Sequence, residues 1–464
     1  MSINLNHGRF TTKSDYMKKE IEVRIPAQVL KIEIEVPYAV NPPDTNPPTI
    51  PTGFKMGSNG FPWSPMSLYT GAGLEWIRCY FATGWGSRPN GLHIQPLWQA
   101  GTSEAWGMDD YLQKANAAGL NVLWCNHQTP EWFRNTGRSD GNNDFAPIPA
   151  GAKRDDPMSY KYYASYLFQI AARYGSVKHP DSVLQVDPEA RWTGDGNVKK
   201  SGLGLLKYIE CWNEPDKWWL KGMEGYFKPE ETAAMMSACY DGHEGRLGPG
   251  HGIRTADPQM IVVMPGLTDF DMPYIEAMDD WFQENRTDQK WPCQIFNLHH
   301  YSNVWNRPNQ HPAQWKNDGG CPPSEDQNFD TVKDMISFAD SLGLPIWITE
   351  FGYDTKAPSN MRIVGKNGKS DEQAQADALV ETFKKYREYG ADACFLFNIH
   401  DDIGAADGGQ FETSGIYSSK ATGFIPKPAV TALKAYAQSL KPTEIATAKN
   451  FEISAASFKR PKKK

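Results

Sequence analysis

The sequence predicts an α/β fold, a single (β/α)8 TIM barrel with a small β appendage at its N-terminus. Three observations support this prediction. From about Gly53 onward, eight short β-favouring runs alternate with amphipathic helical patterns. Two of these runs, far apart in the chain, each end in a glutamate. The pattern before residue 42 is different, which separates the appendage from the barrel.

The N-terminal segment alternates polar and apolar residues over positions 20–25 and 29–36, the period of a half-buried strand. Five prolines follow within residues 42–52, which indicates an extended linker. We therefore expect residues 1–41 to form a β-rich appendage that takes no part in chemistry.

The eight strand candidates share β-favouring residues and precede a loop and a helical pattern. They are residues 54–57, 74–80, 120–126, 205–212, 260–264, 294–300, 345–350 and 393–399. The helical patterns are residues 108–118, 159–174, 229–239, 272–284, 327–342, 371–389 and 428–440, and the segment 58–73 is the weakest helix. Gly119, Gly175 and Gly390 end three of them.

The alternative architecture, a doubly wound open sheet, would require a glycine-rich phosphate turn after the first strand. The sequence there, Gly57-Ser58-Asn59-Gly60, does not complete a GxGxxG motif. The barrel prediction therefore covers residues 53–440. Residues 441–464 are predicted to be a C-terminal extension that ends in a basic tail.

The composition limits the possible partners. The chain has 464 residues, and 48 Lys and Arg against 55 Asp and Glu give a net charge of −7, so no nucleic-acid partner is expected. The seven cysteines include no CxxC pair, and five of them are interpreted as small buried apolar residues, namely Cys79, Cys125, Cys211, Cys293 and Cys394. No apolar run reaches the roughly 18–20 residues of a membrane span.

The N-terminus, Met1-Ser2-Ile3-Asn4, lacks the apolar core of a signal peptide. We expect a secreted or periplasmic protein whose leader is absent from this chain, and a cytoplasmic protein is the alternative. The oligomeric state is left open.

Two glutamates stand at the ends of predicted strands. Residues 208–215 end in Asn213-Glu214-Pro215, and residues 345–352 contain Glu350. All strands of a parallel barrel deliver their C-terminal ends to one face, so both carboxylates are expected on one rim. Such a pair is the equipment for glycoside hydrolysis, and about 5–5.5 Å between the carboxyl groups is expected for a retaining enzyme.

These motifs resemble clan A of the glycoside hydrolases, whose members are retaining (β/α)8 enzymes. The resemblance covers roughly residues 53–440 and rests on the motifs at residues 76–78, 213–215, 299–301, 347–352, 414–417 and 426–429. The loops are loosely similar to families 39 and 5, and residues 129–133 are closest to family 39.

The resemblance implies that Glu214 is the general acid/base and Glu350 the nucleophile. The acid must hold its proton near neutral pH, and apolar surroundings, to which Trp212 could contribute, favour this. The nucleophile must stay ionised and needs hydrogen-bond donors, which the resemblance assigns to Arg78 and Tyr301.

The resemblance also implies substrate contacts. Asn213 would bond the sugar 2-hydroxyl. His299 aligns with the histidine of the clan's His-x-Tyr motif, so that His300 would be the intervening residue that points away. Asn126 and His127 end the third strand and are expected to touch the sugar that precedes the cleaved bond.

Aromatic residues on the rim are candidates for stacking on sugar rings. They are Trp85, Trp132, Trp218, Trp219 and Trp305, of which two are expected to do so, with Trp132 and Trp305 preferred. Many clan members carry a tryptophan at the end of strand eight, where this chain has Phe397. Either Phe397 or a loop aromatic is expected to take its place.

The sequence thus predicts a retaining hydrolase of β-glycosidic bonds in a polysaccharide or oligosaccharide, a β-glycanase or β-glycosidase without metal or cofactor. One alternative is a catalytically silent carbohydrate-binding barrel, which the presence of both glutamates disfavours. The other is a metal-dependent hydrolase that uses His127, His299, His300 and Asp401. The sugar, the linkage and endo or exo action stay open.

Overall fold

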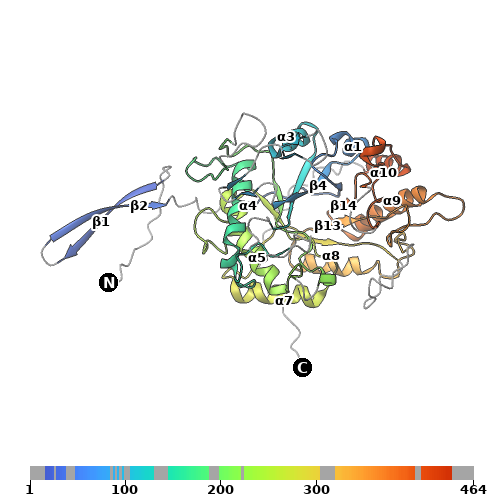
Figure 1. The fold of residues 1–464 in the computed structure, drawn as a ribbon. Coiled ribbons are helices and arrows are strands. Elements are labelled where there is room, and N and C mark those ends of the chain that lie inside the picture. Colours follow the sequence, from blue (N-terminus) through green and yellow to red (C-terminus); the bar gives the residue numbers. More distant parts are fainter. Residues whose placement is uncertain are drawn as a thin grey trace, which may run out of the picture.

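A computed structural model shows eight parallel strands joined in one sheet, with the helices around it (Figure 1). The strands are β3 (Lys55–Gly60), β4 (Trp76–Ala82), β9 (Asn121–His127), β10 (Tyr208–Glu210), β11 (Ile261–Val263), β12 (Phe296–His299), β13 (Ile346–Phe351) and β14 (Ala393–Leu396). The structure describes residues 48–83, 107–129, 145–187, 198–220, 224–303, 319–402 and 409–440, and the backbone of the six short or N-terminal strands given below.

The sheet closes on itself. Its hydrogen-bonded order is β11-β10-β9-β4-β3-β14-β13-β12. The two outer strands of this order meet through the parallel bridges Val263 to Ile295 and Leu267 to Leu298. The backbone N–H of Met264 also donates to the carbonyl of Ile295 at 2.9 Å. The predicted (β/α)8 barrel is therefore confirmed.

The helices lie outside the ring of strands (Figure 1). They are α1 (Met66–Gly71), α3 (Met108–Ala117), α4 (Lys161–Tyr174), α5 (Pro229–Asp241), α6 (Ile253–Ala256), α7 (Met272–Asn285), α8 (Thr331–Ser341), α9 (Asp371–Tyr389) and α10 (Pro428–Ser439), with the 3-10 turns η2 (Pro157–Tyr160), η3 (Trp218–Leu220) and η5 (Lys420–Thr422). All seven expected helices are present. Gly390 ends α9 in the left-handed conformation that favours glycine.

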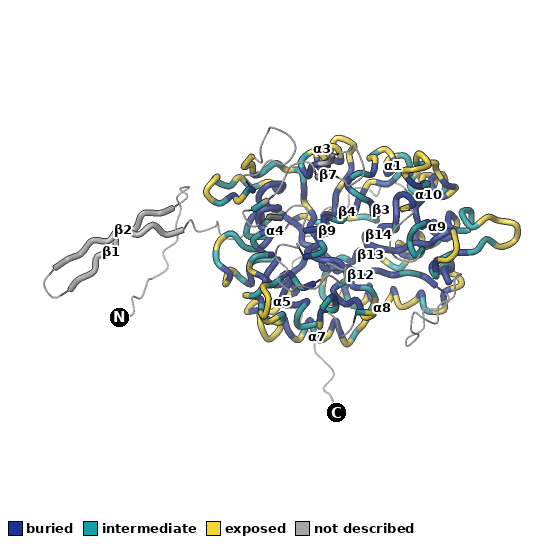
Figure 2. The backbone as a smooth tube through the Cα atoms, viewed as in Figure 1, coloured by how far each residue is buried: buried dark blue, intermediate teal, exposed yellow. Residues whose placement is uncertain are grey.

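Apolar side chains fill the inside of the barrel. They are Trp76, Leu123, Tyr208, Ile261, Val263, Ile295, Trp347, Ala393 and Phe395. A Cβ atom on Gly57 would lie 2.5 Å from the Phe395 ring, so only glycine fits at that point of β3. A second, larger cluster fills the layer between strands and helices, and the strands are accordingly buried (Figure 2). The polar residues at the C-terminal ends of the strands therefore lie next to a tightly packed apolar interior.

The five cysteines that were predicted to be small core residues are buried, as expected. All seven are buried and unpaired with one another. In the described part of the chain, no helix is long and apolar enough to cross a bilayer.

The N-terminal segment contains β1 (Tyr16–Ile25) and β2 (Gln28–Pro37), which pair antiparallel in the register Tyr16 to Pro37. Two further hairpins follow β4 along the chain. They are β5 (Ser87–Arg88) with β6 (Gly91–Leu92), and β7 (Leu97–Trp98) with β8 (Ala105–Trp106). The β content expected before residue 42 is present. The expected C-terminal extension, 441–464, and most of the linker lie outside the described residues.

Candidate active site

Glu350 lies near the end of β13 and receives three hydrogen bonds. Arg78 Nη1 donates to its Oε1 at 2.7 Å, and the hydroxyl of Tyr301 donates to its Oε2 at 2.9 Å. The hydroxyl of Tyr80 also donates to Oε1. Burial alone would raise the pKa of Glu350, but the charges of His299 and Arg78 and the two tyrosine hydroxyls hold it below the ordinary value. Glu350 is therefore a carboxylate at neutral pH.

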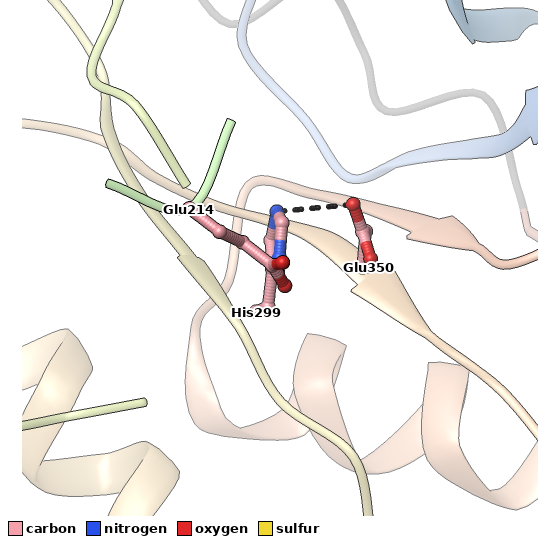
Figure 3. Close-up of side chains that lie close together, drawn as sticks. All are labelled: Glu214, His299 and Glu350. Carbon is pink, nitrogen blue, oxygen red and sulfur yellow. Dashed lines mark hydrogen bonds and ion pairs between the residues drawn. The ribbon is translucent and has the colours of Figure 1, made fainter. Parts of the chain in front are cut away.

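His299, the last residue of β12, lies between the two glutamates (Figure 3). Its Nδ1 is 2.8 Å from Glu214 Oε1, and its Nε2 is 3.5 Å from Glu350 Oε1. Burial alone would lower the pKa of His299, but the charge of Glu350 and the hydrogen bond to Glu214 raise it. One oxygen of each glutamate and a ring nitrogen all lie within 4.8 Å of one another. The two carboxyl groups thus face one another across the imidazole.

The backbone at Glu214 has a left-handed conformation, with φ of 46°. Its N–H donates to the carbonyl of Gly266 at 2.9 Å, and Asn213 pairs with Gly266 as an isolated bridge. A left-handed non-glycine residue is strained by about 1–3 kcal/mol and persists where its surroundings enforce it. The bonds to Gly266 supply that enforcement and direct the Glu214 side chain toward His299.

Gly266 makes room for the imidazole. A Cβ atom at this position would lie 2.2 Å from His299 Nε2. The N–H of Gly266 donates to Glu210 Oε1 at 2.9 Å. Gly266 therefore helps to position three residues. Its backbone bonds Glu214 and Glu210, and its lack of a side chain leaves room for His299.

Glu210 is a buried acid that sequence reasoning did not single out. Arg78 Nε donates to its Oε2 at 2.7 Å and Arg78 Nη2 to its Oε1 at 2.9 Å, and both side chains are 0% exposed. The same guanidinium donates to Asn213 Oδ1 at 2.7 Å and to Asn59 Oδ1 at 2.9 Å. The only sequence signal for Glu210 is an acid inside an apolar run, four positions before Glu214.

The structure also describes the other expected sugar contacts. Asn126 is buried, its Oδ1 accepts from Trp124 Nε1 at 3.2 Å, and its Nδ2 has no partner among the described residues. The half-buried ring of His127 lies 5.2 Å from that of Tyr80. Phe397 is half-buried, with its centroid 6.5 Å from Tyr80. His127 and Phe397 therefore lie close to the ring of Tyr80. Asn126 directly precedes His127 at the end of β9.

A second missed residue, Phe411, lies in the segment after β14. Its ring centroid is 5.1 Å from Tyr301 and 5.2 Å from Phe397. Its N–H donates to Asp354 Oδ2 at 2.7 Å, and Thr413 N donates to Asp354 Oδ1 at 2.9 Å. Phe411 is the loop aromatic that completes the apolar wall begun by Phe397.

Two expectations for neighbouring residues had different outcomes. His300 points away from the glutamates, as expected: its Nδ1 is 2.7 Å from the hydroxyl of Tyr386, and burial lowers its pKa to about 4. Trp212 was considered as a possible contributor to apolar surroundings of Glu214, but its ring lies elsewhere. Its ring packs against Tyr163 and Phe227 in the layer between strands and helices.

The residues of the metal-dependent alternative do not converge. His300 bonds Tyr386, and Asp401 forms a buried ion pair with Lys427 at 2.7 Å. In the part of the chain that the structure describes, the group of three acidic or imidazole side chains close enough to share an ion is Glu214, His299 and Glu350.

Of the five tryptophans expected on the rim, the structure describes two. Trp85, Trp132 and Trp305 lie outside the described residues. Trp218 and Trp219 form η3, directly after the Glu214 segment, and both are exposed.

The sequence matches no family model and no curated protein. Among solved structures, the chain is similar to a family 39 glycoside hydrolase from the gut symbiont Bacteroides cellulosilyticus WH2, with a TM-score of 0.51 and 15% identity over 92% of this chain and 71% of that one. A β-glucosidase from Exiguobacterium marinum has a TM-score of 0.48 and 12% identity over 84% and 98% of the two chains. A family 5 mannosidase from Rhizomucor miehei has a TM-score of 0.45 and 13% identity over 83% and 92%. The similarity to the family 39 structure agrees with the fold described above, and the chain is by fold a (β/α)8 barrel.

Proposed function

We propose that the protein is a retaining glycoside hydrolase that cleaves β-glycosidic bonds of an oligosaccharide or polysaccharide. The observation that carries the proposal is the pair of carboxyl groups of Glu214, in the loop after β10, and Glu350, near the end of β13, with oxygens within 4.8 Å of each other. Retaining enzymes place these groups about 5–5.5 Å apart, whereas inverting enzymes need about 6.5–9.5 Å to admit a water between them.

In the first step, Glu350 attacks the anomeric carbon while Glu214 gives its proton to the leaving oxygen. The glycosidic bond breaks, a glycosyl–Glu350 ester forms, and Glu214 is left as a carboxylate. Arg78, Tyr80 and Tyr301 hold Glu350 ionised before the attack. These donors also fix which oxygen faces the sugar, because each bonds a defined carboxylate atom.

In the second step, the Glu214 carboxylate takes a proton from water, and the water oxygen attacks the anomeric carbon. The ester bond to Glu350 breaks, and both glutamates return to their starting states. His299 keeps the Glu214 carboxyl group in place through both steps, because the 2.8 Å hydrogen bond forms with the proton on either partner. Two inversions at one carbon give net retention.

A metal-dependent reaction is less well supported by the same residues. A cation held by Glu214, His299 and Glu350 would lie beside the Arg78 guanidinium, which is 2.7 Å from Glu350 Oε1. The like charges would repel at short range in a buried site. Glu350 is also already bonded by two tyrosine hydroxyls, which a metal would have to displace.

The test of the proposed function separates the two glutamates by the configuration of azide products. In Glu350→Ala, azide attacks from the vacated side and should give the inverted glycosyl azide. In Glu214→Ala, a dinitrophenyl glycoside should still form the ester, and azide should then give the retained product. Poorly activated substrates should lose about 10²–10⁴-fold in rate in Glu214→Ala.

The anomeric configuration of both azide products is measured by NMR on a β-glycoside that the wild type hydrolyses. The same anomer from both variants would show that the assigned roles are wrong. So would an equal loss on activated and unactivated substrates in Glu214→Ala.

A further inference from the structure

Two adjacent tryptophans, Trp218 and Trp219, form an exposed apolar pair in the loop that carries Glu214. They are 37% and 49% exposed, and they are the exposed aromatic residues of the described part of the chain. The other tryptophans of that part, such as Trp124 and Trp347, are buried or half-buried. An exposed pair of large apolar rings is typical of a binding site.

The segment that carries the pair is held firmly on the barrel. The carboxylate of Asp216, itself 6% exposed, accepts from Thr268 N at 2.9 Å and from Thr268 Oγ1 at 3.0 Å. The N–H of Phe227 donates to the carbonyl of Pro215 at 2.8 Å. Burial raises the pKa of Asp216 to about 7. Because the supporting segment is already ordered, binding to the rings costs little conformational entropy.

The pair belongs to the side of the site that carries Glu214. Trp218 and Trp219 follow Glu214 by four and five positions, in the loop that continues from β10. In the closed barrel, β11 and β12 separate β10 from β13, which carries Glu350. In the proposed reaction Glu350 bonds the sugar that stays on the enzyme, and Glu214 protonates the group that leaves. A group bound beside Glu214 is therefore the leaving group.

The two indole rings form a corner. Their centroids are 5.3 Å apart and their planes meet at 89°. Two perpendicular rings cannot both lie flat against successive units of a straight chain, but they can hold one unit between the face of one ring and the edge of the other. A pyranose ring offers an apolar face of C–H groups for such a contact, with hydroxyl groups around its edge.

We infer that Trp218 and Trp219 form one binding subsite for a sugar ring on the leaving-group side of the cleaved bond. The inference rests on the proposed function and makes it more specific. The substrate is a β-linked oligosaccharide or polysaccharide in which the leaving group is itself a pyranose, and a simple aryl or alkyl glycoside is a poorer substrate.

The test compares two substrates that differ on the leaving-group side alone. The first is an oligosaccharide that the wild type hydrolyses, found among β-linked gluco-, xylo- and manno-oligosaccharides. The second is the β-glycosyl fluoride of the same sugar, whose leaving group has no ring. In Trp218→Ala and in Trp219→Ala, kcat/KM on the oligosaccharide should fall by at least about fivefold. On the fluoride it should stay within about twofold of the wild-type value.

The corner geometry predicts that the two substitutions are not additive, so Trp218→Ala/Trp219→Ala should lose little more than either single variant. Ile425→Ala is the matched control, because Ile425 is an exposed apolar side chain, 61% exposed, in the segment between η5 and α10. It should leave both substrates unaffected.

Equal losses on the fluoride and the oligosaccharide would overturn the subsite, because they would mean that the rings support the fold of the Glu214 segment. Unchanged kinetics in both single variants would overturn it as well. Wild-type protein that hydrolyses neither substrate would instead overturn the proposed function. The subsite is then tested by calorimetric titration with the same oligosaccharides: weaker binding by the double variant supports it, and equal binding overturns it.

Discussion

At the scale of single residues, the site depends on one buried arginine shared between two carboxylates. Arg78 bonds Glu210 through two nitrogens and Glu350 through a third. An unpaired buried ion costs several kcal/mol, so Arg78 needs at least one permanent counter-charge. Glu210 supplies it. In the proposed reaction, ester formation at Glu350 therefore removes one negative charge without leaving Arg78 unpaired.

The donors to Glu350 predict a shift of the pH profile when one is removed. The active form of Glu350 is the carboxylate, so kcat/KM falls as the pH falls through its pKa. The hydroxyl of Tyr301 contributes to holding that pKa below the ordinary value. In Tyr301→Phe the ionised form loses a hydrogen bond, the pKa rises, and the acid limb of kcat/KM should move to higher pH. At neutral pH we expect a loss of about tenfold.

Tyr353→Phe is the matched control for this experiment. Tyr353 is buried and its hydroxyl is 2.8 Å from that of Thr382, in the outer layer. Its removal should lower stability without moving the acid limb. An acid limb that stays at the wild-type pH in Tyr301→Phe would show that Tyr301 does not stabilise the charge on Glu350.

The sequence predicts those site residues whose role follows from their place at a strand end. Glu214, Glu350 and His299 are recognisable in this way. Glu210 and Gly266 are not, because their roles depend on each other across 56 positions of the chain. A backbone N–H and an absent side chain leave no pattern in a sequence.

At the scale of elements, one buried aspartate ties the segment after β13 to the segment after β14. Asp354 accepts from the backbone N–H groups of Phe411 and Thr413 and from the hydroxyl of Ser359. This places Phe411 against Tyr301. The aromatic contact of Phe411 with Tyr301 is thus built by two loops, and neither loop alone predicts it.

Asp354→Asn should loosen this contact, because Phe411 N–H and Thr413 N–H bind different carboxylate oxygens and the amide nitrogen that replaces one of them cannot accept. We expect a stability loss of about 1–3 kcal/mol and a fall in kcat/KM of roughly tenfold or more, as Phe411 and Tyr301 lose their fixed positions. Thermal unfolding and steady-state kinetics on one β-glycoside measure the two effects.

Asp257→Asn is the control at a distance from the site. Asp257 is buried and accepts from the N–H and the hydroxyl of Ser176, in the segment that follows α4. The Asp257→Asn variant should be less stable than the wild type and should keep the wild-type kcat/KM. If both variants behaved alike, the effect of Asp354 would be one of stability alone.

The predicted elements were right in kind and less accurate at their ends. The expected strand at residues 205–212 is β10, which ends at Glu210. Beyond Glu210 the alternation of inward and outward side chains no longer applies, so Trp212 turns to the outer layer. The error has a physical cause: the chain leaves the sheet early to form the left-handed turn at Glu214.

At the scale of the whole molecule, the periodic alternation of strands and helices was enough to predict the closed barrel. The pattern fixes which elements exist, and the packing rules for parallel strands leave few ways to arrange them. The division of the chain into an appendage, a linker and a catalytic barrel stays a prediction.

This division predicts that the appendage is dispensable for catalysis. Among the described residues, the side chains that bond Glu350 and Glu214 include Arg78, Tyr301 and His299, which all lie after residue 42. A chain that begins at residue 42 should hydrolyse a small aryl β-glycoside with kcat/KM within about twofold of the full chain. Circular dichroism and thermal unfolding establish that the shortened chain is folded. A folded but inactive shortened chain would show that the appendage completes the site.

The contacts of Arg78 have a consequence for how the protein acquires its activity. From β4, this one side chain reaches Asn59 on β3, Cys125 on β9, Glu210 on β10 and Glu350 on β13. The pair Arg78 and Glu350 is 272 positions apart, so it forms only when strands from both halves of the chain have joined the ring. A chain still emerging from the ribosome, or a half-barrel fragment, therefore contains the local motifs of its segment but lacks the ion pair of Arg78 with Glu350, the proposed nucleophile.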